Sequence, residues 1–77
     1  MTTDPYIVSN AEICHGQPCF RGTRVLVSSV LEMLEAEQTY EQIIEAYPGL
    51  TTKHIQAALH LASQIIQGEH YIPFQAA

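Results

Sequence analysis

The sequence is short of charge, and basic residues are the scarcest of its charged side chains. Only 14% of the 77 residues are charged, against about 25% in a typical globular protein, and three Lys or Arg residues oppose eight Asp or Glu residues. The net charge of −5 repels a phosphate backbone, whereas nucleic-acid-binding domains usually carry a basic patch. The composition therefore disfavours DNA binding by the isolated chain.

Long apolar runs and targeting signals are missing as well. No run approaches the roughly 20 apolar residues that a membrane-spanning helix needs. The N-terminal stretch MTTDPYIVSN has neither the basic residues nor the apolar core of a signal peptide. We expect a soluble, cytoplasmic protein.

Cysteine is rare, and its placement does not indicate a metal site. Cys14 and Cys19 are expected to be small, reduced thiols, because nothing in the chain suggests secretion. With His15 they could supply three zinc ligands, but the second half of a zinc-binding signature is missing. The adjacency of Cys14 and His15 does not aim one side chain at the other, so no nucleophile and base are paired. We expect no metal, no cofactor and no enzymatic activity.

Apolar residues, at 47%, are abundant enough for one folded domain over residues 1–77. A chain of this length buries only about 60% of its unfolded surface, so its core is marginal. The first 27 residues read as short strands, with a β-type run at 6–8. A hairpin is expected between 18–20 and 24–27, with Gly22 in the connection at a positive φ.

From residue 28 to residue 68 the apolar period is helical and predicts three helices. The first fades near residue 37, the second ends before Pro48, and the third runs to Gln67 with Gly68 as its C-cap. The candidate N-caps are Ser28 or Ser29, then Thr39 in a capping box with Gln42, then Thr51 or Thr52. The predicted fold is mainly α: a three-helix helix-turn-helix domain, homeodomain-like or winged-helix-like, with a short N-terminal β element and a tail at 69–77.

The third helix is a candidate recognition helix. Side chains at the N-terminal end of such a helix reach base edges, where Lys can read guanine and Gln can read adenine. The candidate DNA-binding residues are Thr51, Thr52, Lys53 and Gln56. The alternative is a three-helix packing unit whose polar face meets only water.

The apolar face of the third helix is also wide, at about 200° of the helix circumference. Half of it is free to contact a second copy or another partner, unless the other elements wrap the whole helix. The candidate contact residues are Leu61 and Ile65 in the helix and Tyr71, Ile72 and Phe74 in the tail. The tail either folds back over the helices of its own or the sister subunit, or lies along a partner. We expect a homodimer.

Acidic residues gather in the middle of the chain. Residues 28–50 hold five glutamates and no basic residue: Glu32, Glu35, Glu37, Glu41 and Glu45. Such a run indicates either a solvated face or a surface that meets a basic protein.

Three blocks of the sequence resemble domain-of-unknown-function family 433. Residues 12–25, EICHGQPCFRGTRV, match its E-I-x-x-G-x-P-x-x-x-G-T-R-[IV] motif. A segment like residues 41–51, EQIIEAYPGLT, and a helix rich in Ala and Leu follow in the same order. The resemblance covers roughly residues 6–66. One departure is Lys53-His54, where the family commonly has an acidic residue.

The resemblance implies a helix-turn-helix fold with a small N-terminal β element, usually as a dimer, and it brings no catalytic residue. It also implies a role as the antitoxin of a type II toxin–antitoxin pair, whose toxin has a PIN-like nuclease fold. Because a nuclease needs a positive RNA-binding surface, the acidic middle segment is a plausible match for it. We expect the chain to neutralise such a toxin, with operator DNA binding by the complex. The alternatives are a free-standing helix-turn-helix regulator and a pure oligomerisation module.

Overall fold

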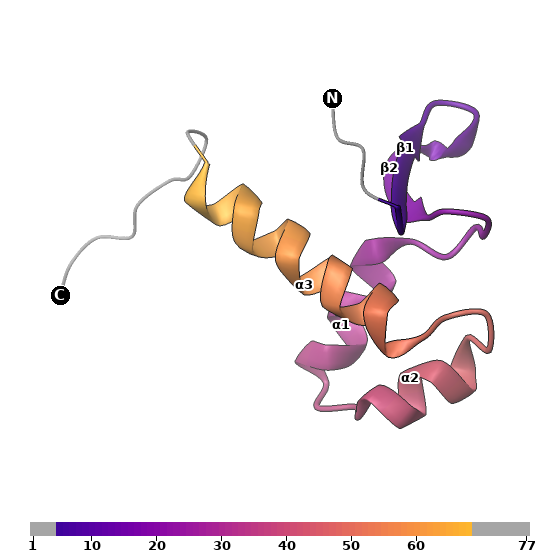
Figure 1. Cartoon of the computed structure of the whole chain (residues 1–77), viewed down its shortest axis with the longest axis vertical. Helices are drawn as coiled ribbons and strands as arrows, with labels where there is room; N and C mark the ends of the chain where they lie inside the picture. Colours follow the sequence, from indigo (N-terminus) through magenta and orange to yellow (C-terminus); the bar gives the residue numbers. More distant parts are fainter. Residues whose placement is uncertain (1–4, 69–77) are drawn as a thin grey trace, which may run out of the picture.

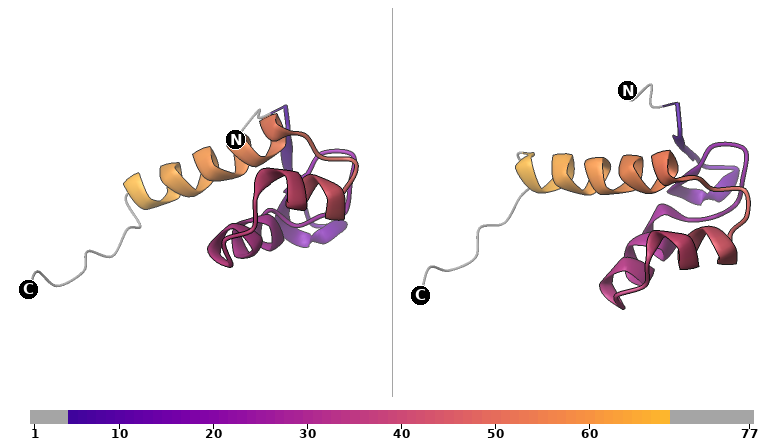
Figure 2. Two further views of the ribbon diagram at one scale, coloured as in Figure 1. Left: turned by 90° about the horizontal axis from the view of Figure 1, so that it is seen from below. Right: turned by 60° about the horizontal axis from the view of Figure 1, so that its bottom comes forward.

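The computed structural model describes residues 5–68. Its elements are, in chain order, β1 (Ile7–Asn10), β2 (Ile13–Phe20), α1 (Val27–Glu35), α2 (Tyr40–Ala46) and α3 (Thr52–Gln67). The two strands form an antiparallel hairpin beside the start of α1, and α1 and α2 lie on one side of α3 (Figure 1). The second half of α3 extends past the other elements in both views of Figure 2. The predicted three-helix fold with a short N-terminal β element is confirmed.

The hairpin, however, joins different segments from those expected. Ile7 pairs with Phe20, and residues 24–27 form no strand beyond a single bridge between Cys19 and Leu26. The expected pairing begins, with the Phe20 N–H donating to the Val25 carbonyl at 3.0 Å, but it ends at Leu26 because that residue is already the N-cap of α1. The Thr23 hydroxyl donates to the Phe20 carbonyl at 2.8 Å and accepts from the Val25 N–H at 3.0 Å, so it closes the turn between the two segments.

Two left-handed turns shape this N-terminal region. Gly22 has a φ of +83°, as predicted, in the turn that follows β2. A second turn was not foreseen: the register of the hairpin shifts between Ser9 and Asn10, and His15 and Gly16 have φ values of 55° and 82°. The Ser9 hydroxyl donates to the Gly16 carbonyl and closes this turn. The β element is therefore short and irregular.

The helix boundaries follow local side-chain chemistry in two cases out of three. Thr39 and Gln42 form the predicted capping box at α2, with backbone-to-side-chain bonds of 2.8 and 3.1 Å. Thr51 precedes α3, and Gly68 follows it, also as predicted. The prediction of Ser28 or Ser29 as the cap of α1 was wrong, because α1 begins at Val27 and its N-cap, Leu26, has no side chain that can accept a hydrogen bond.

The core takes buried residues from every element, and those of α3 lie in the first half of that helix. Its buried members are Ile7, Phe20, Val27, Val30, Ile43, Leu50, Ile55 and Ala58. A large apolar side chain buried in this way contributes about 1.5–3 kcal/mol. The fold is therefore held around the first two turns of α3, which contacts α1, α2 and β1.

Candidate functional site

The start of α3 is fixed to the β element by His54. Its Nδ1 accepts the Thr51 backbone N–H at 3.0 Å and lies 2.9 Å from the Thr51 hydroxyl oxygen. Histidine therefore occupies the position that Glu or Gln takes in a capping box. The ring also packs edge-on against Tyr6 and Phe20, with centroids 4.9 and 5.7 Å apart. His54 thus has a structural role that the sequence analysis did not foresee.

The predicted DNA-binding residues come together on the exposed side of this helix start. Thr51, Thr52, Lys53 and Gln56 are all exposed. Lys53 is the one Lys or Arg in the three helices, and the whole sequence has three Lys or Arg residues. DNA binding by these residues stays a prediction, and the net charge of −5 disfavours it in the isolated chain.

The acidic segment, residues 32–45, runs over the end of α1, the connecting turn and α2. Its five glutamates are Glu32, Glu35, Glu37, Glu41 and Glu45, and all are exposed. The Gln38 N–H donates to the Met33 carbonyl at 3.0 Å, and the Glu37 N–H donates to the Leu34 carbonyl at 2.9 Å. These two bonds are the Schellman motif that ends many helices.

Three of these glutamates lie where a carboxylate costs stability. Glu37 occupies the left-handed position of the Schellman motif with a φ of 67°, a position usually taken by Gly. Glu32 and Glu35 lie in the last turn of α1, at the negative end of the helix dipole, and no basic residue shares that turn. Local folding preferences therefore do not explain the negative charge at the end of α1.

The second half of α3 exposes large apolar side chains. Ile65 and Ile66 are 61% and 57% exposed, Leu59 in the middle of the helix is 41% exposed, and Leu61 is half-buried against the core. The apolar face predicted for this helix is therefore buried at Ile55 and Ala58, near its start, and exposed at Ile65 and Ile66, in its last turn.

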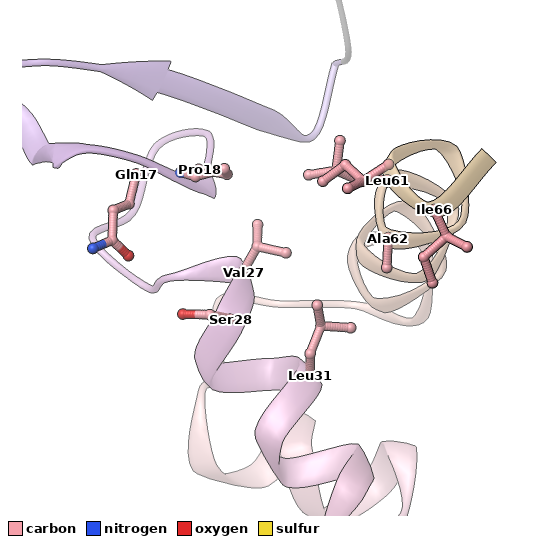
Figure 3. Close-up of a pocket in the computed structure, with 9 residues that line it drawn as sticks. Gln17, Pro18, Val27, Ser28, Leu31, Leu61, Ala62 and Ile66 are labelled. Carbon is pink, nitrogen blue, oxygen red and sulfur yellow. The ribbon is translucent and has the colours of Figure 1, made fainter. Parts of the chain in front are cut away.

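An apolar hollow of about 320 Å³ lies beside this half of α3. Leu61, Val27 and Leu31 point into the space between α3 and α1, and Pro18 of β2 closes one side (Figure 3). The complete lining is Gln17, Pro18, Val27, Ser28, Leu31, Leu61, Ala62, Ile65 and Ile66. The structure thus brings the predicted contact residues Leu61 and Ile65 together with residues of α1 and β2 that the sequence analysis did not assign.

Other predicted sites have a simpler outcome. Tyr71, Ile72 and Phe74 lie outside the described residues. Cys19 is fully buried, with its Sγ 3.8 Å from the Thr23 carbonyl oxygen. Between residues 5 and 68, no three His, Cys, Asp or Glu side chains gather closely enough to hold a metal ion. No helix in this part of the chain is long and apolar enough to cross a membrane.

The sequence blocks at 12–25 and 41–51 now have places in the fold: the first spans β2 and the Gly22 turn, and the second spans most of α2 and the connection that ends at Thr51, the N-cap of α3. No curated protein and no solved structure matches the chain. A family model matches residues 7–62, which cover both strands, α1, α2 and most of α3. The chain therefore belongs to the family described as protein of unknown function, DUF433.

Proposed function

We propose that this protein is a cytoplasmic antitoxin that binds a PIN-like nuclease toxin and neutralises it through the acidic segment. The observation that carries the proposal is the exposed negative charge at the end of α1, placed where it opposes the helix dipole. Side chains that cost local stability persist where function needs them. A partner with a positive surface would offset the repulsion between these glutamates and the negative end of the α1 dipole.

The chemistry of inhibition requires no reactive group on this chain. A ribonuclease attracts RNA through basic side chains around its active site, and an acidic protein surface is attracted to the same side chains. Two consecutive helices and the turn between them present five carboxylates and no basic residue, and they supply such a surface. The bound antitoxin then excludes RNA, because it covers the basic side chains of the nuclease that RNA would contact.

A second function, as a helix-turn-helix regulator, rests on the exposed start of α3. Thr51, Lys53 and Gln56 offer side chains that can reach phosphates and base edges. With a net charge of −5, the isolated chain is a poor DNA ligand. A basic toxin bound to the acidic segment removes part of this repulsion, so operator binding belongs to the complex.

The test expresses the product of the neighbouring reading frame, which the proposal expects to be a PIN-like nuclease, and uses an RNA-cleavage assay with purified proteins. Full-length protein is expected to abolish cleavage at a stoichiometric ratio. The variant Glu35→Gln/Glu37→Gln/Glu41→Gln/Glu45→Gln is expected to lose inhibition, and added salt is expected to weaken inhibition by the natural sequence. Lys53→Gln is the control that keeps inhibition while weakening an operator mobility shift of the complex. Undiminished inhibition by the fourfold variant contradicts the proposal.

A further inference from the structure

All the Lys and Arg residues of the chain lie at one end of the molecule. Arg21 and Arg24 belong to the turn that follows β2, which we call the arginine turn (residues 21–24), and Lys53 lies in the first turn of α3. Figure 1 shows the arginine turn and the start of α3 on the same side of the fold, away from the far end of α3. All three basic side chains are exposed. A chain of net charge −5 therefore collects its positive charge at one end.

Carboxylates are missing from the segments that build this end. Residues 13–31, which contain the arginine turn, and residues 46–68, which contain α3, hold no Asp or Glu. In the part of the chain that the structure describes, the carboxylates are those of the acidic segment and of Glu12, which lies beyond the other end of β2. Neither segment thus carries a charge that cancels the basic side chains, and the net charge of the chain conceals this local excess.

The aromatic contacts of His54 hold the two segments together. Its ring packs edge-on against Phe20, the residue before Arg21, and against Tyr6, whose carbonyl accepts the Arg21 N–H at 2.8 Å. His54 itself lies in the first turn of α3. Packing against the core therefore fixes the arginine turn beside the start of α3.

A hollow of about 410 Å³ opens beside the arginine turn. It is lined by Val8 of β1 and by Gly22, Thr23 and Arg24. Gly22 has no side chain, and nothing lies within 4 Å of the place that a Cβ would occupy, so a ligand can approach the backbone closely there. The guanidinium of an arginine matches a phosphate group with two parallel N–H···O bonds. The hollow thus has the space and the chemistry for a phosphate.

The exposure of this end indicates an extended anion and not a small one. A small-molecule site buries most of its ligand and orients it with a few placed polar groups. Among the described residues, however, no polar or charged side chain is buried. Duplex DNA carries one negative charge per about 1.7 Å of its axis, and it binds basic side chains that are spread over a surface. The arginine turn and Lys53 are spread in this way, on two separate segments.

We propose that the arginine turn binds the phosphate backbone of DNA while the start of α3 lies in the major groove. Arg24 and the hollow take one phosphate, and Arg21 pairs with another. Phosphate contacts position a domain on the duplex, and base contacts give it specificity. The inference rests on the operator binding proposed above, and it gives the β element a positioning role that inhibition of a nuclease does not require.

Fluorescence anisotropy with two short DNA duplexes, measured over a range of salt concentrations, tests the assignment. One duplex has the sequence directly upstream of this reading frame, and the other is unrelated. The full chain is measured alone and in complex with the product of the neighbouring reading frame. Arg24→Gln is expected to weaken binding of both duplexes by the same factor and to lower the slope of log K against log salt by about 1, because one phosphate contact is lost. Arg24→Lys keeps the charge and is expected to keep the slope.

Gln64→Glu is the matched control. It changes the net charge by the same amount as Arg24→Gln, but on an exposed residue in the second half of α3. Its salt dependence is expected to equal that of the natural chain. Circular dichroism checks that the variants keep their helices.

Three outcomes overturn the proposal. The first is that neither duplex binds, even at the lowest salt, to the isolated chain or to the complex. The second is an equal drop in slope for Gln64→Glu and Arg24→Gln, because this result shows a general charge effect. The third is that Arg24→Gln binds both duplexes like the natural chain but no longer inhibits the nuclease, because the hollow then takes a carboxylate of a protein partner.

The antitoxin role is tested separately by the RNA-cleavage assay. A chain that fails to inhibit cleavage, but whose DNA binding depends on Arg24 in the expected way, refutes that role and supports the phosphate site. A chain that inhibits cleavage but binds neither duplex, alone or in the complex, does the reverse.

Discussion

The two halves of α3 share one apolar periodicity but have opposite surroundings. In the first half, Ile55 and Ala58 are fully buried, and His54 ties the helix to Tyr6 and Phe20. In the second half, Ile65 and Ile66 remain more than half exposed. A hydrophobic pattern thus shows which face of a helix avoids water, but it does not show whether the same chain covers that face.

The comparison is tested most severely by truncating one isoleucine in each half. Ile55→Ala is expected to lower the free energy of unfolding by about 2–5 kcal/mol, because it removes a fully buried side chain and leaves a cavity. Ile65→Ala is expected to change the stability of the monomer by less than about 0.5 kcal/mol. Urea unfolding at low protein concentration, where a dimer dissociates, measures both. Similar losses in the two variants would show that the second half belongs to the core of the same chain.

The features of this molecule that the sequence could predict depend on residues a few positions apart in the chain. The Thr39–Gln42 capping box, the end of α3 at Gly68 and the positive φ of Gly22 are local, and all three are present. The strand expected at 24–27 is reduced to a single bridge, because Leu26 is already the N-cap of α1 and Val27 is its first residue. The β-type pattern of these residues does not show that the helix starts so early.

For the candidate sites, too, local features could be predicted, and features that depend on the tertiary fold could not. Exposure of Lys53 and Gln56 follows from their place on the polar face of α3, and it was predicted. The hollow was not, because it combines α3 with Val27, Leu31 and Pro18, whose proximity depends on the tertiary fold. The left-handed conformation of Glu37 left no signal in the sequence, because glutamate rarely takes the position that glycine usually fills.

A smaller effect is expected where the first half of α3 is anchored. His54→Ala removes the side chain that accepts the Thr51 N–H and two edge-on ring contacts, and it is expected to cost about 1–2 kcal/mol. His60→Ala is the matched control, since His60 is exposed on the same helix and its loss is expected to change stability by less than about 0.5 kcal/mol. Thermal unfolding of the two variants checks this difference. If both melt like the natural chain, the packing of His54 against the β element does not stabilise α3.

The smallest effect on the free energy of unfolding is expected at Glu37, where the substitution stabilises the fold. The second half of α3 and the end of α1 have one property in common: each is unfavourable for the isolated chain, in one case as exposed apolar surface and in the other as a strained, like-charged turn. Glu37→Gly relieves the left-handed strain and removes a carboxylate beside a helix C-terminus, so it is expected to stabilise the fold by about 0.5–1 kcal/mol.

Glu41→Gln is the control with the opposite sign. Glu41 lies in the first turn of α2, where the helix dipole favours a negative charge, so its loss is expected to cost about 0.3–1 kcal/mol. Both substitutions remove one negative charge from the acidic segment, so both are expected to weaken inhibition of the nuclease while they move the unfolding midpoint in opposite directions. Inhibition that instead follows stability, stronger in Glu37→Gly and weaker in Glu41→Gln, would show that the order of the fold, and not the charge of this segment, determines binding.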